Sequence, residues 1–182
     1  MRIAFTGASG SGKSTLANWV AQRYGIPLNP VGSRSIAKAM GFENPYDVDK
    51  AGKRDIFQTR LQIEKAKWEN AHDSFVTDRT PLDEMTYTAL HDVTTVDKTY
   101  WDVAWKQWHR YSIVFFCPID VLQKLDGDPA RISDPTYHLV YETMLRGLFA
   151  RGQEVIKLSD SDLTLRHREI EKQIRYRFAE RP

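Results

Sequence analysis

Hydrophobic and polar positions along the chain follow two kinds of pattern. Short apolar runs predict strands at residues 2–5, 26–31, 74–77, 112–117 and 154–158. The first, fourth and fifth runs are dense in β-branched or aromatic residues, which is typical of parallel strands buried on both faces. The second run is weaker, because Pro27 and Pro30 cannot donate hydrogen bonds to a neighbouring strand.

Between these runs the apolar residues recur at the spacing of amphipathic helices. The predicted helices cover residues 14–24, 33–40, 49–70, 81–90, 96–109, 136–150 and 163–179. Strands that alternate with helices build βαβ units, in which helices cover both faces of a parallel sheet. The pattern therefore predicts one three-layer α/β domain over residues 1–182, and no repeat or linker-like segment divides it.

Composition and charge exclude several classes of protein. Hydrophobic residues make up 41% of the 182 residues, a normal share for a globular domain, and no run of 18 apolar residues predicts a membrane span. A net charge of +2 is too small for a dedicated DNA-binding domain. The N-terminus lacks the pattern of a secretory signal peptide, and the single Cys117 lies in an apolar run. We therefore expect a buried thiol in a reducing cytoplasm.

The segment from Gly7 to Ser14 carries the clearest chemical signal, since it matches G-x-x-x-x-G-K-[ST] in full between a predicted strand and a predicted helix. Its glycines let successive backbone N–H groups point at a polyphosphate, and the helix start adds the positive end of its dipole. Lys13 is expected to reach the β- and γ-phosphates of ATP, and the Ser14 hydroxyl to bind Mg²⁺. The predicted nucleotide-binding residues are Gly7, Ala8, Ser9, Gly10, Ser11, Gly12, Lys13, Ser14 and Thr15.

Asp78 and Arg79 form the second signal, because they directly follow the third predicted strand. Ligands of open α/β sheets bind beyond the carboxyl ends of parallel strands. Asp78 is therefore expected to lie near Ser14 and to bind Mg²⁺ or its water shell, while Arg79 neutralises a phosphate on the acceptor side. A structural alternative stays open, in which Asp78 caps the helix that begins at Thr80-Pro81.

A phosphate loop near the start of the chain, Asp-Arg-Thr after the third strand and an arginine-bearing polar segment at 124–135 resemble the P-loop nucleoside and nucleotide kinases. The chain looks most like phage-type deoxynucleoside monophosphate kinases and nicotinamide riboside kinase-like P-loop proteins. The resemblance spans nearly the whole chain. It implies a P-loop NTPase fold with a five-stranded parallel sheet in the order 2-3-1-4-5 and a short lid at about 124–135. The location implied is the cytoplasm, that of the host if the chain is phage-encoded.

The resemblance also suggests roles for two more arginines. Arg131 lies in the lid segment, and we expect it to join Lys13 in stabilising charge on the transferred phosphoryl group; Lys124 and Arg146 are weaker candidates. Arg34 follows the second strand, where these kinases begin their acceptor site, and is predicted to bind an acceptor phosphate. The predicted catalytic residues are Lys13, Asp78, Arg79 and Arg131, with Arg34 and Arg79 binding substrate.

The absence of acidic residues after the phosphate loop helps to predict which chemical group of the acceptor receives the phosphoryl group. Many nucleoside kinases place a carboxylate base just after the second strand, yet no Asp or Glu occurs between Ser14 and Glu43. A monophosphate is already a nucleophilic oxyanion and needs no base. This favours ATP-dependent transfer to a (deoxy)nucleoside monophosphate, giving the diphosphate. Asp47, Asp78 and Asp83 remain alternatives for a base.

Other functions stay open. The acceptor of a kinase could instead be a hydroxyl of a nucleoside such as nicotinamide riboside, or of a modified base in DNA such as 5-hydroxymethyluracil. DNA stays possible as a substrate, although it is not favoured, because the C-terminal helix is basic and Trp101, Trp105 and Trp108 lie on one helix face. This row of tryptophans also fits core packing or a homodimer contact. A P-loop ATPase or switch is a third alternative. Residues 159–162 either border the adenine or cap the last helix.

Overall fold

The computed structural model describes residues 1–29, 33–43, 49, 52, 54–59, 62, 74–119, 134–152 and 154–179, with the backbone alone at 33–35 and 179. All five predicted strands are present, and all pair in parallel. They are β1 (Arg2–Thr6), β2 (Leu28–Asn29), β3 (Phe75–Asp78), β4 (Ile113–Phe116) and β5 (Ile156–Lys157), in the order β2-β3-β1-β4-β5. This confirms the predicted topology. β2 has two described residues, directly after Pro27, and residues 30 and 31 of the predicted strand lie outside the described residues.

Helices connect the strands as expected. The described ones are α1 (Lys13–Tyr24), α2 (Ser33–Ala39), α4 (Pro81–His91), α5 (Lys98–Trp108), α6 (Pro135–Phe149) and α7 (Leu163–Ala179), with a 3-10 turn η1 (Val93–Thr95) before α5. Of the helix predicted at 49–70, residues 52, 54–59 and 62 are described and helical. Among the described helices, none has the length and apolar character needed to span a membrane.

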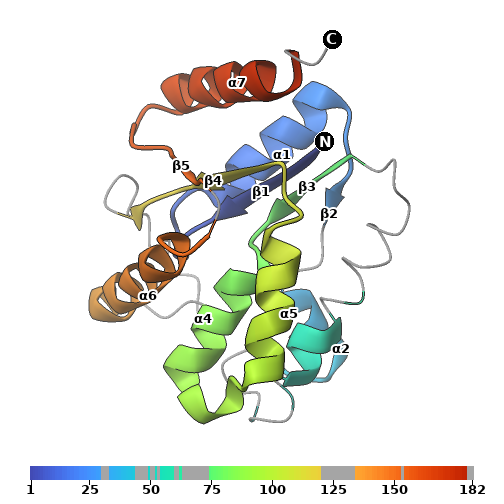
Figure 1. The fold of residues 1–182 in the computed structure, drawn as a ribbon, viewed down its shortest axis with the longest axis vertical. Helices are drawn as coiled ribbons and strands as arrows, with labels where there is room; N and C mark the ends of the chain where they lie inside the picture. The colour runs from blue at the N-terminus through green and yellow to red at the C-terminus, as the bar shows by residue number, and fades with distance from the viewer. Residues whose placement is uncertain are drawn as a thin grey trace.

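The sheet separates two apolar layers. α1 and α7 cover one face, and α4, α5 and α6 cover the other (Figure 1). Successive residues of each central strand point to opposite layers: Ile113 and Phe115 of β4 pack with α1 and α7, whereas Val114 and Phe116 pack with α4, α5 and α6. This alternation is why the strands read as continuous apolar runs in the sequence.

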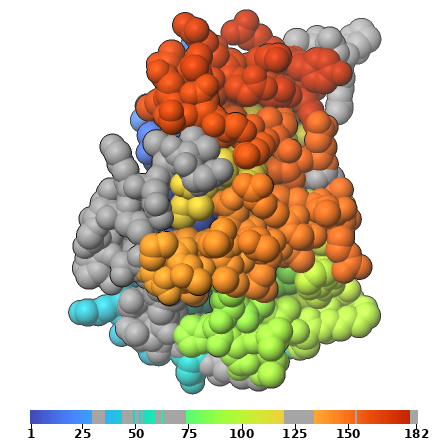
Figure 2. All heavy atoms as spheres, turned by 90° about the vertical axis from the view of Figure 1, so that its left-hand side faces the viewer, coloured from blue at the N-terminus to red at the C-terminus, as the bar shows by residue number. Residues whose placement is uncertain are grey.

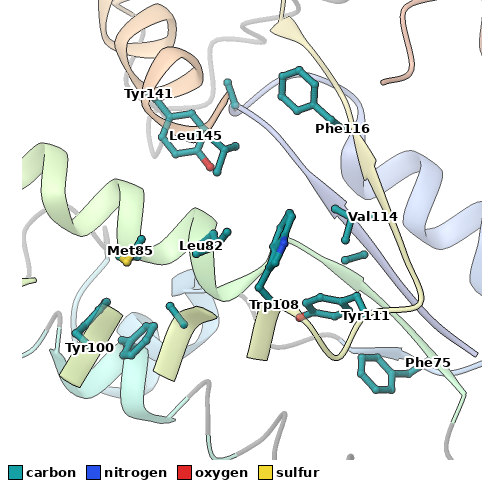
Figure 3. Close-up of a cluster of buried hydrophobic side chains, with 14 residues drawn as sticks. Phe75, Leu82, Met85, Tyr100, Trp108, Tyr111, Val114, Phe116, Tyr141 and Leu145 are labelled. Carbon is teal, nitrogen blue, oxygen red and sulfur yellow. The ribbon is translucent and has the colours of Figure 1, made fainter. Parts of the chain in front are cut away.

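Trp108 lies at the centre of the larger layer. Its side chain is fully buried, stacks on Phe149 with ring centroids 5.3 Å apart, and lies between Leu82 of α4 and Val114 of β4 (Figure 3). Trp101 and Trp105 are partly buried against the same cluster. The core interpretation of the tryptophan row is therefore correct for Trp108, which is not available for stacking on a base.

α7 docks on the sheet through one apolar stripe. Ile170 and Ile174 are buried with α1 and β4, as the spacing predicted. Two of its arginines form ion pairs, Arg175 with Glu171 at 3.2 Å and Arg177 with Glu154 at 2.8 Å. Glu171 also pairs with Arg23 of α1 at 2.9 Å. These pairs balance part of the positive charge that kept DNA open as a substrate.

Candidate active site

The phosphate loop lies at the carboxyl edge of the sheet, between the end of β1 at Thr6 and the start of α1 at Lys13. Figure 2 views this edge: atoms from the start of the chain (blue) and from the β4 region (yellow) are recessed between α6 and α7. Gly7 has φ +135°, and a Cβ there would lie 2.3 Å from the Cys117 carbonyl oxygen. Only glycine fits this position, because β4 passes so close to the loop.

Lys13 is folded into the loop. Its Nζ donates to the Ala8 carbonyl at 2.5 Å and to Ser11 Oγ at 3.2 Å, and only 4% of the residue is exposed. Burial, with a further contribution from nearby Arg79, lowers the pKa of Lys13 to about 8. The loop therefore contains a desolvated ammonium group, which a polyphosphate would stabilise strongly.

Ser14 and Asp78 meet across the site. Ser14 Oγ, in the first turn of α1, donates to Asp78 Oδ2 at the end of β3 over 2.5 Å. Sequence reasoning expected them side by side, because the two chain segments reach the same sheet edge. The alternative role of Asp78 as a helix cap is wrong: Thr80 is the N-cap of α4, and its hydroxyl accepts from the Asp83 N–H.

The oxygens of Ser14 and Asp78 suit Mg²⁺. A hydroxyl and a carboxylate are hard ligands, and an octahedral ion held by one or two protein oxygens completes its shell with phosphate oxygens and water. Within the described residues, no group of three or more His, Cys, Asp or Glu side chains could bind a metal on its own. The donor set thus fits a magnesium ion that arrives with a nucleotide.

Arg79 adopts a strained backbone directly after Asp78. Its φ is +85°, a rare value for a residue with a side chain, and its N–H donates to the Phe5 carbonyl at 2.8 Å. The guanidinium lies over the ring of Tyr87 on α4, 4.6 Å from the centroid. Its Nη1 is buried and makes no hydrogen bond with any described residue. Burial raises the pKa of the Tyr87 phenol, against the opposite effect of Arg79.

Asp83 connects the end of β1 and the phosphate loop to α4 and α6 through buried hydrogen bonds, a role that sequence reasoning missed. It is fully buried and accepts five hydrogen bonds: from Thr6 Oγ1 at 2.8 Å, the Gly7 N–H at 3.2 Å, the Thr80 N–H and Oγ1 at 2.7 Å each, and the Tyr141 hydroxyl at 2.6 Å. These donors satisfy both of its oxygens. The hypothesis that Asp83 is a catalytic base is therefore not supported, since the carboxylate is fully buried and both of its oxygens already accept hydrogen bonds from the protein.

We expect Asp83→Ala to lower the free energy of unfolding by about 3–5 kcal/mol, because it leaves several buried donors without an acceptor. Urea denaturation followed by circular dichroism measures the change. Asp102→Ala, at an exposed position of α5, is the matched control and should change stability by less than about 0.5 kcal/mol. Equal stabilities for the two variants would contradict the structural role of Asp83.

Other predicted residues lie elsewhere or outside the described residues. The side chain of Arg34 is not described, although its backbone lies in α2, and Asp47, Lys124, Arg131 and residues 124–133 of the predicted lid fall outside. The last two lid residues are described and begin α6, with Asp134 as its N-cap and Pro135 as its first residue. Arg146 pairs with Glu142 on α6 at 2.6 Å and lies over the Phe116 ring. This arginine is held on its own helix, which weakens its candidacy for phosphoryl transfer.

Arg166 of α7 is a second residue that sequence reasoning missed. It is 1% exposed, and it donates from Nη1 to the Ser11 carbonyl of the phosphate loop at 3.1 Å and from Nε to the Asp160 carbonyl at 2.5 Å. The same arginine lines a cavity of about 350 Å³ between β5 and α7, together with Ser159, Asp160 and Leu165. The cavity adjoins the phosphate loop through this side chain.

The loop that leads into α7 also caps the helix. Asp162 Oδ1 accepts hydrogen bonds from the N–H groups of Thr164 at 2.6 Å and Leu165 at 3.2 Å. The capping interpretation of residues 159–162 is therefore confirmed. Cys117 is buried as predicted, and burial raises the pKa of its thiol to about 12.

Fold and loop together define a P-loop nucleotide-binding protein. A family described as "AAA domain" matches residues 2–166, and the chain belongs to this family. No curated protein sequence matches the chain.

Solved structures give the same fold at low sequence identity. A deoxyadenosine kinase from M. mycoides, with the products dCMP and dCDP bound, is 15% identical with a TM-score of 0.67 over 97% of this chain and 100% of that one. NadR, in complex with NAD and AMP-PNP, is 15% identical with a TM-score of 0.73 over all of this chain, which spans 50% of NadR. Thymidylate kinase from Ehrlichia chaffeensis is 16% identical with a TM-score of 0.64 over 96% and 98%. The resemblance to P-loop nucleoside and nucleotide kinases is thus confirmed in the fold.

Proposed function

We propose that the chain is an ATP-dependent kinase that transfers the γ-phosphoryl group to a (deoxy)nucleoside monophosphate. The observation that carries the proposal is the 2.5 Å approach of Ser14 Oγ to Asp78 Oδ2 beside the buried Lys13. A phosphate loop alone indicates nucleotide binding. A hydroxyl and a carboxylate placed together beside it provide the oxygens for the metal that accompanies a triphosphate.

The donor would bind along the loop from Gly7 to Thr15, with its phosphates against the loop N–H groups and Lys13. Mg²⁺, bound by Ser14 and Asp78, would supply charge neutralisation at the β- and γ-phosphates. An oxygen of the acceptor phosphate attacks the γ-phosphorus, the bond from that phosphorus to the β–γ bridging oxygen breaks, and ADP leaves. The residues of this chain act by position and charge, and no proton has to move from the acceptor.

Arg79 supports a phosphate on the acceptor. Its buried Nη1 makes no hydrogen bond with any described residue, and a buried guanidinium nitrogen needs an acceptor. An acceptor phosphate would satisfy that need with a charge-assisted hydrogen bond. We assign Arg79 and Arg34 to the acceptor, and Arg131 to the transferred group.

One observation favours a hydroxyl acceptor instead. Glu84 is buried in the first turn of α4, where its charge acts on Tyr87, and Tyr87 in turn lies under Arg79. A carboxylate there could accept the proton of an attacking hydroxyl. The second candidate is therefore a kinase of a nucleoside, such as one similar to nicotinamide riboside, or of a modified base in DNA.

A panel of acceptors tests both candidates. The protein is incubated with Mg²⁺ and γ-labelled ATP against deoxynucleoside monophosphates, nucleosides, nicotinamide riboside, and plain and base-modified DNA. Label on a monophosphate supports the proposal, and label on a nucleoside or on DNA supports the second candidate. Release of free phosphate alone, with every acceptor, would contradict both and indicate an ATPase.

The affinity for ATP should fall with rising pH. Lys13 has a pKa near 8 in the empty loop, and bound phosphates raise it, so binding takes up a proton above pH 8. The Kd for ATP should be constant below that pH and rise up to about tenfold per unit above it. Titration calorimetry from pH 7 to 9.5 measures this dependence, and Lys13→Met, which cannot titrate, is the control. A constant Kd for the wild type over the whole range would contradict the assignment.

A further inference from the structure

Arg166 connects two loops that are far apart in sequence and adjacent at the proposed donor site. Its Nη1 donates to the Ser11 carbonyl in the phosphate loop, and its Nε donates to the Asp160 carbonyl between β5 and α7. Both acceptors are backbone carbonyl groups, so the arginine restrains the backbone conformation of both loops. A planar guanidinium presents its donors in one fixed geometry, which suits such a bridge.

The contact with Ser11 determines how the phosphate loop presents its donors. In a trans peptide, the carbonyl and the following N–H point in opposite directions. Arg166 binds the Ser11 carbonyl from the side of α7, so the N–H of Gly12 in the same peptide unit points the other way. Gly12 is the residue before α1, with φ +85°, where a glycine backbone turns freely unless something holds it. Arg166 supplies that restraint.

The charge of Arg166 indicates an anionic ligand. The side chain is 1% exposed, and none of the ion pairs among the described residues includes it. Its Nη2 is buried and has no hydrogen-bond partner in the described part of the chain. Burial accordingly lowers the pKa of Arg166. A buried cation that contacts the phosphate loop at Ser11, and that makes no ion pair within the described part of the chain, adds positive charge to the empty loop and favours a polyphosphate.

We propose that Arg166 is a positioning residue for the donor: it holds the Ser11–Gly12 peptide with its N–H toward the triphosphate and ties the phosphate loop to the loop beside the 350 Å³ cavity. This inference rests on the proposed function, because it assumes that the phosphate loop binds a triphosphate. It predicts that Arg166, through the Ser11–Gly12 peptide, affects binding of the donor's phosphates whether or not a base is attached to them.

Titration calorimetry on the full chain with Mg²⁺ tests the assignment. ATP, tripolyphosphate and a deoxynucleoside monophosphate are titrated into the wild type, Arg166→Gln and Arg166→Lys, with Arg175→Gln as the control. Arg175 lies on the same helix and pairs with Glu171, and its side chain is 72% exposed. We expect Arg166→Gln to weaken binding of both ATP and tripolyphosphate by about tenfold to a hundredfold, as for the loss of a charged hydrogen bond.

Binding of the monophosphate should change less than twofold in Arg166→Gln, and Arg175→Gln should bind all three ligands as the wild type does. Arg166→Lys keeps the charge but cannot bridge both carbonyls, so it should lose affinity in the same direction; it also serves as the test if Arg166→Gln does not fold. A folded variant that binds tripolyphosphate within twofold of the wild type would overturn the assignment, as would a loss confined to ATP. A wild type that binds neither ATP nor tripolyphosphate would instead overturn the proposed function.

Discussion

Lys13→Ala should lower kcat by about 10³-fold or more while the protein stays folded. The ammonium lies inside the phosphate loop, where its charge would stabilise the transferred phosphoryl group in a site with little competing solvent. In the described structure Nζ contacts only the Ala8 carbonyl and the Ser11 hydroxyl. Its burial is also unfavourable, since desolvation lowers its pKa to about 8. The Lys13→Ala protein should therefore remain folded.

Transfer of label from γ-labelled ATP measures the loss, and the thermal midpoint shows whether the variant is folded. Lys106→Ala is the matched control, since Lys106 is an exposed lysine of α5 that is remote from the phosphate loop in sequence. It should leave kcat unchanged within about twofold. Near-normal turnover in a folded Lys13→Ala protein would refute the kinase proposal, because no other described residue places an ammonium in the loop.

The central sheet and the phosphate loop could be predicted because their signals are local. The apolar runs identify β1, β3 and β4, and G-x-x-x-x-G-K-S between a strand and a helix has few other interpretations. The order of the strands in the sheet has no local signal, because no spacing in the sequence indicates which strand lies beside which. It was predicted from the resemblance to P-loop kinases. The approach of Ser14 to Asp78 then followed, because the phosphate loop that leads to Ser14 begins at the carboxyl end of β1, and Asp78 lies at the carboxyl end of the neighbouring β3.

Asp83 and Arg166 show what sequence reasoning missed. The capping of α4 had a readable signal in Thr80-Pro81-Leu82-Asp83, which fits [ST]-x-x-[DE] before an apolar segment. That pattern would have excluded the alternative role of Asp78 as the helix cap. It could not have shown that Asp83 also accepts from Thr6, Gly7 and Tyr141, since these contacts exist only once the layers have packed.

For Arg166 the signal was its position on the helix. It lies four residues before Ile170 and eight before Ile174, so it extends the buried stripe of α7 by one turn. An arginine on an apolar stripe indicates a buried, partnered cation. In a segment rich in exposed arginines, however, only the tertiary structure reveals that its partners are the carbonyls of Ser11 and Asp160.

Asp78→Asn should lower kcat by about 10²- to 10³-fold and raise the Mg²⁺ concentration that gives half-maximal activity. Asparagine has nearly the same shape and can still accept a hydrogen bond from Ser14 Oγ, so the fold should remain. What it loses is the negative charge that attracts the metal. Activity measured against Mg²⁺ concentration detects both effects, and Asp102→Asn on α5 is the control. An unchanged Mg²⁺ dependence with a normal kcat would remove Asp78 from the site.

A double-mutant cycle makes this test specific to the pair. If Ser14 and Asp78 bind one ion, Ser14→Ala should remove little further activity from the Asp78→Asn protein, because the ion is already poorly bound. If the two side chains acted separately, their losses in activation free energy would add. Strong non-additivity in kcat, together with parallel shifts in the Mg²⁺ dependence, would tie the 2.5 Å contact to metal binding. Additive losses would mean that the two side chains act independently and do not bind one ion together.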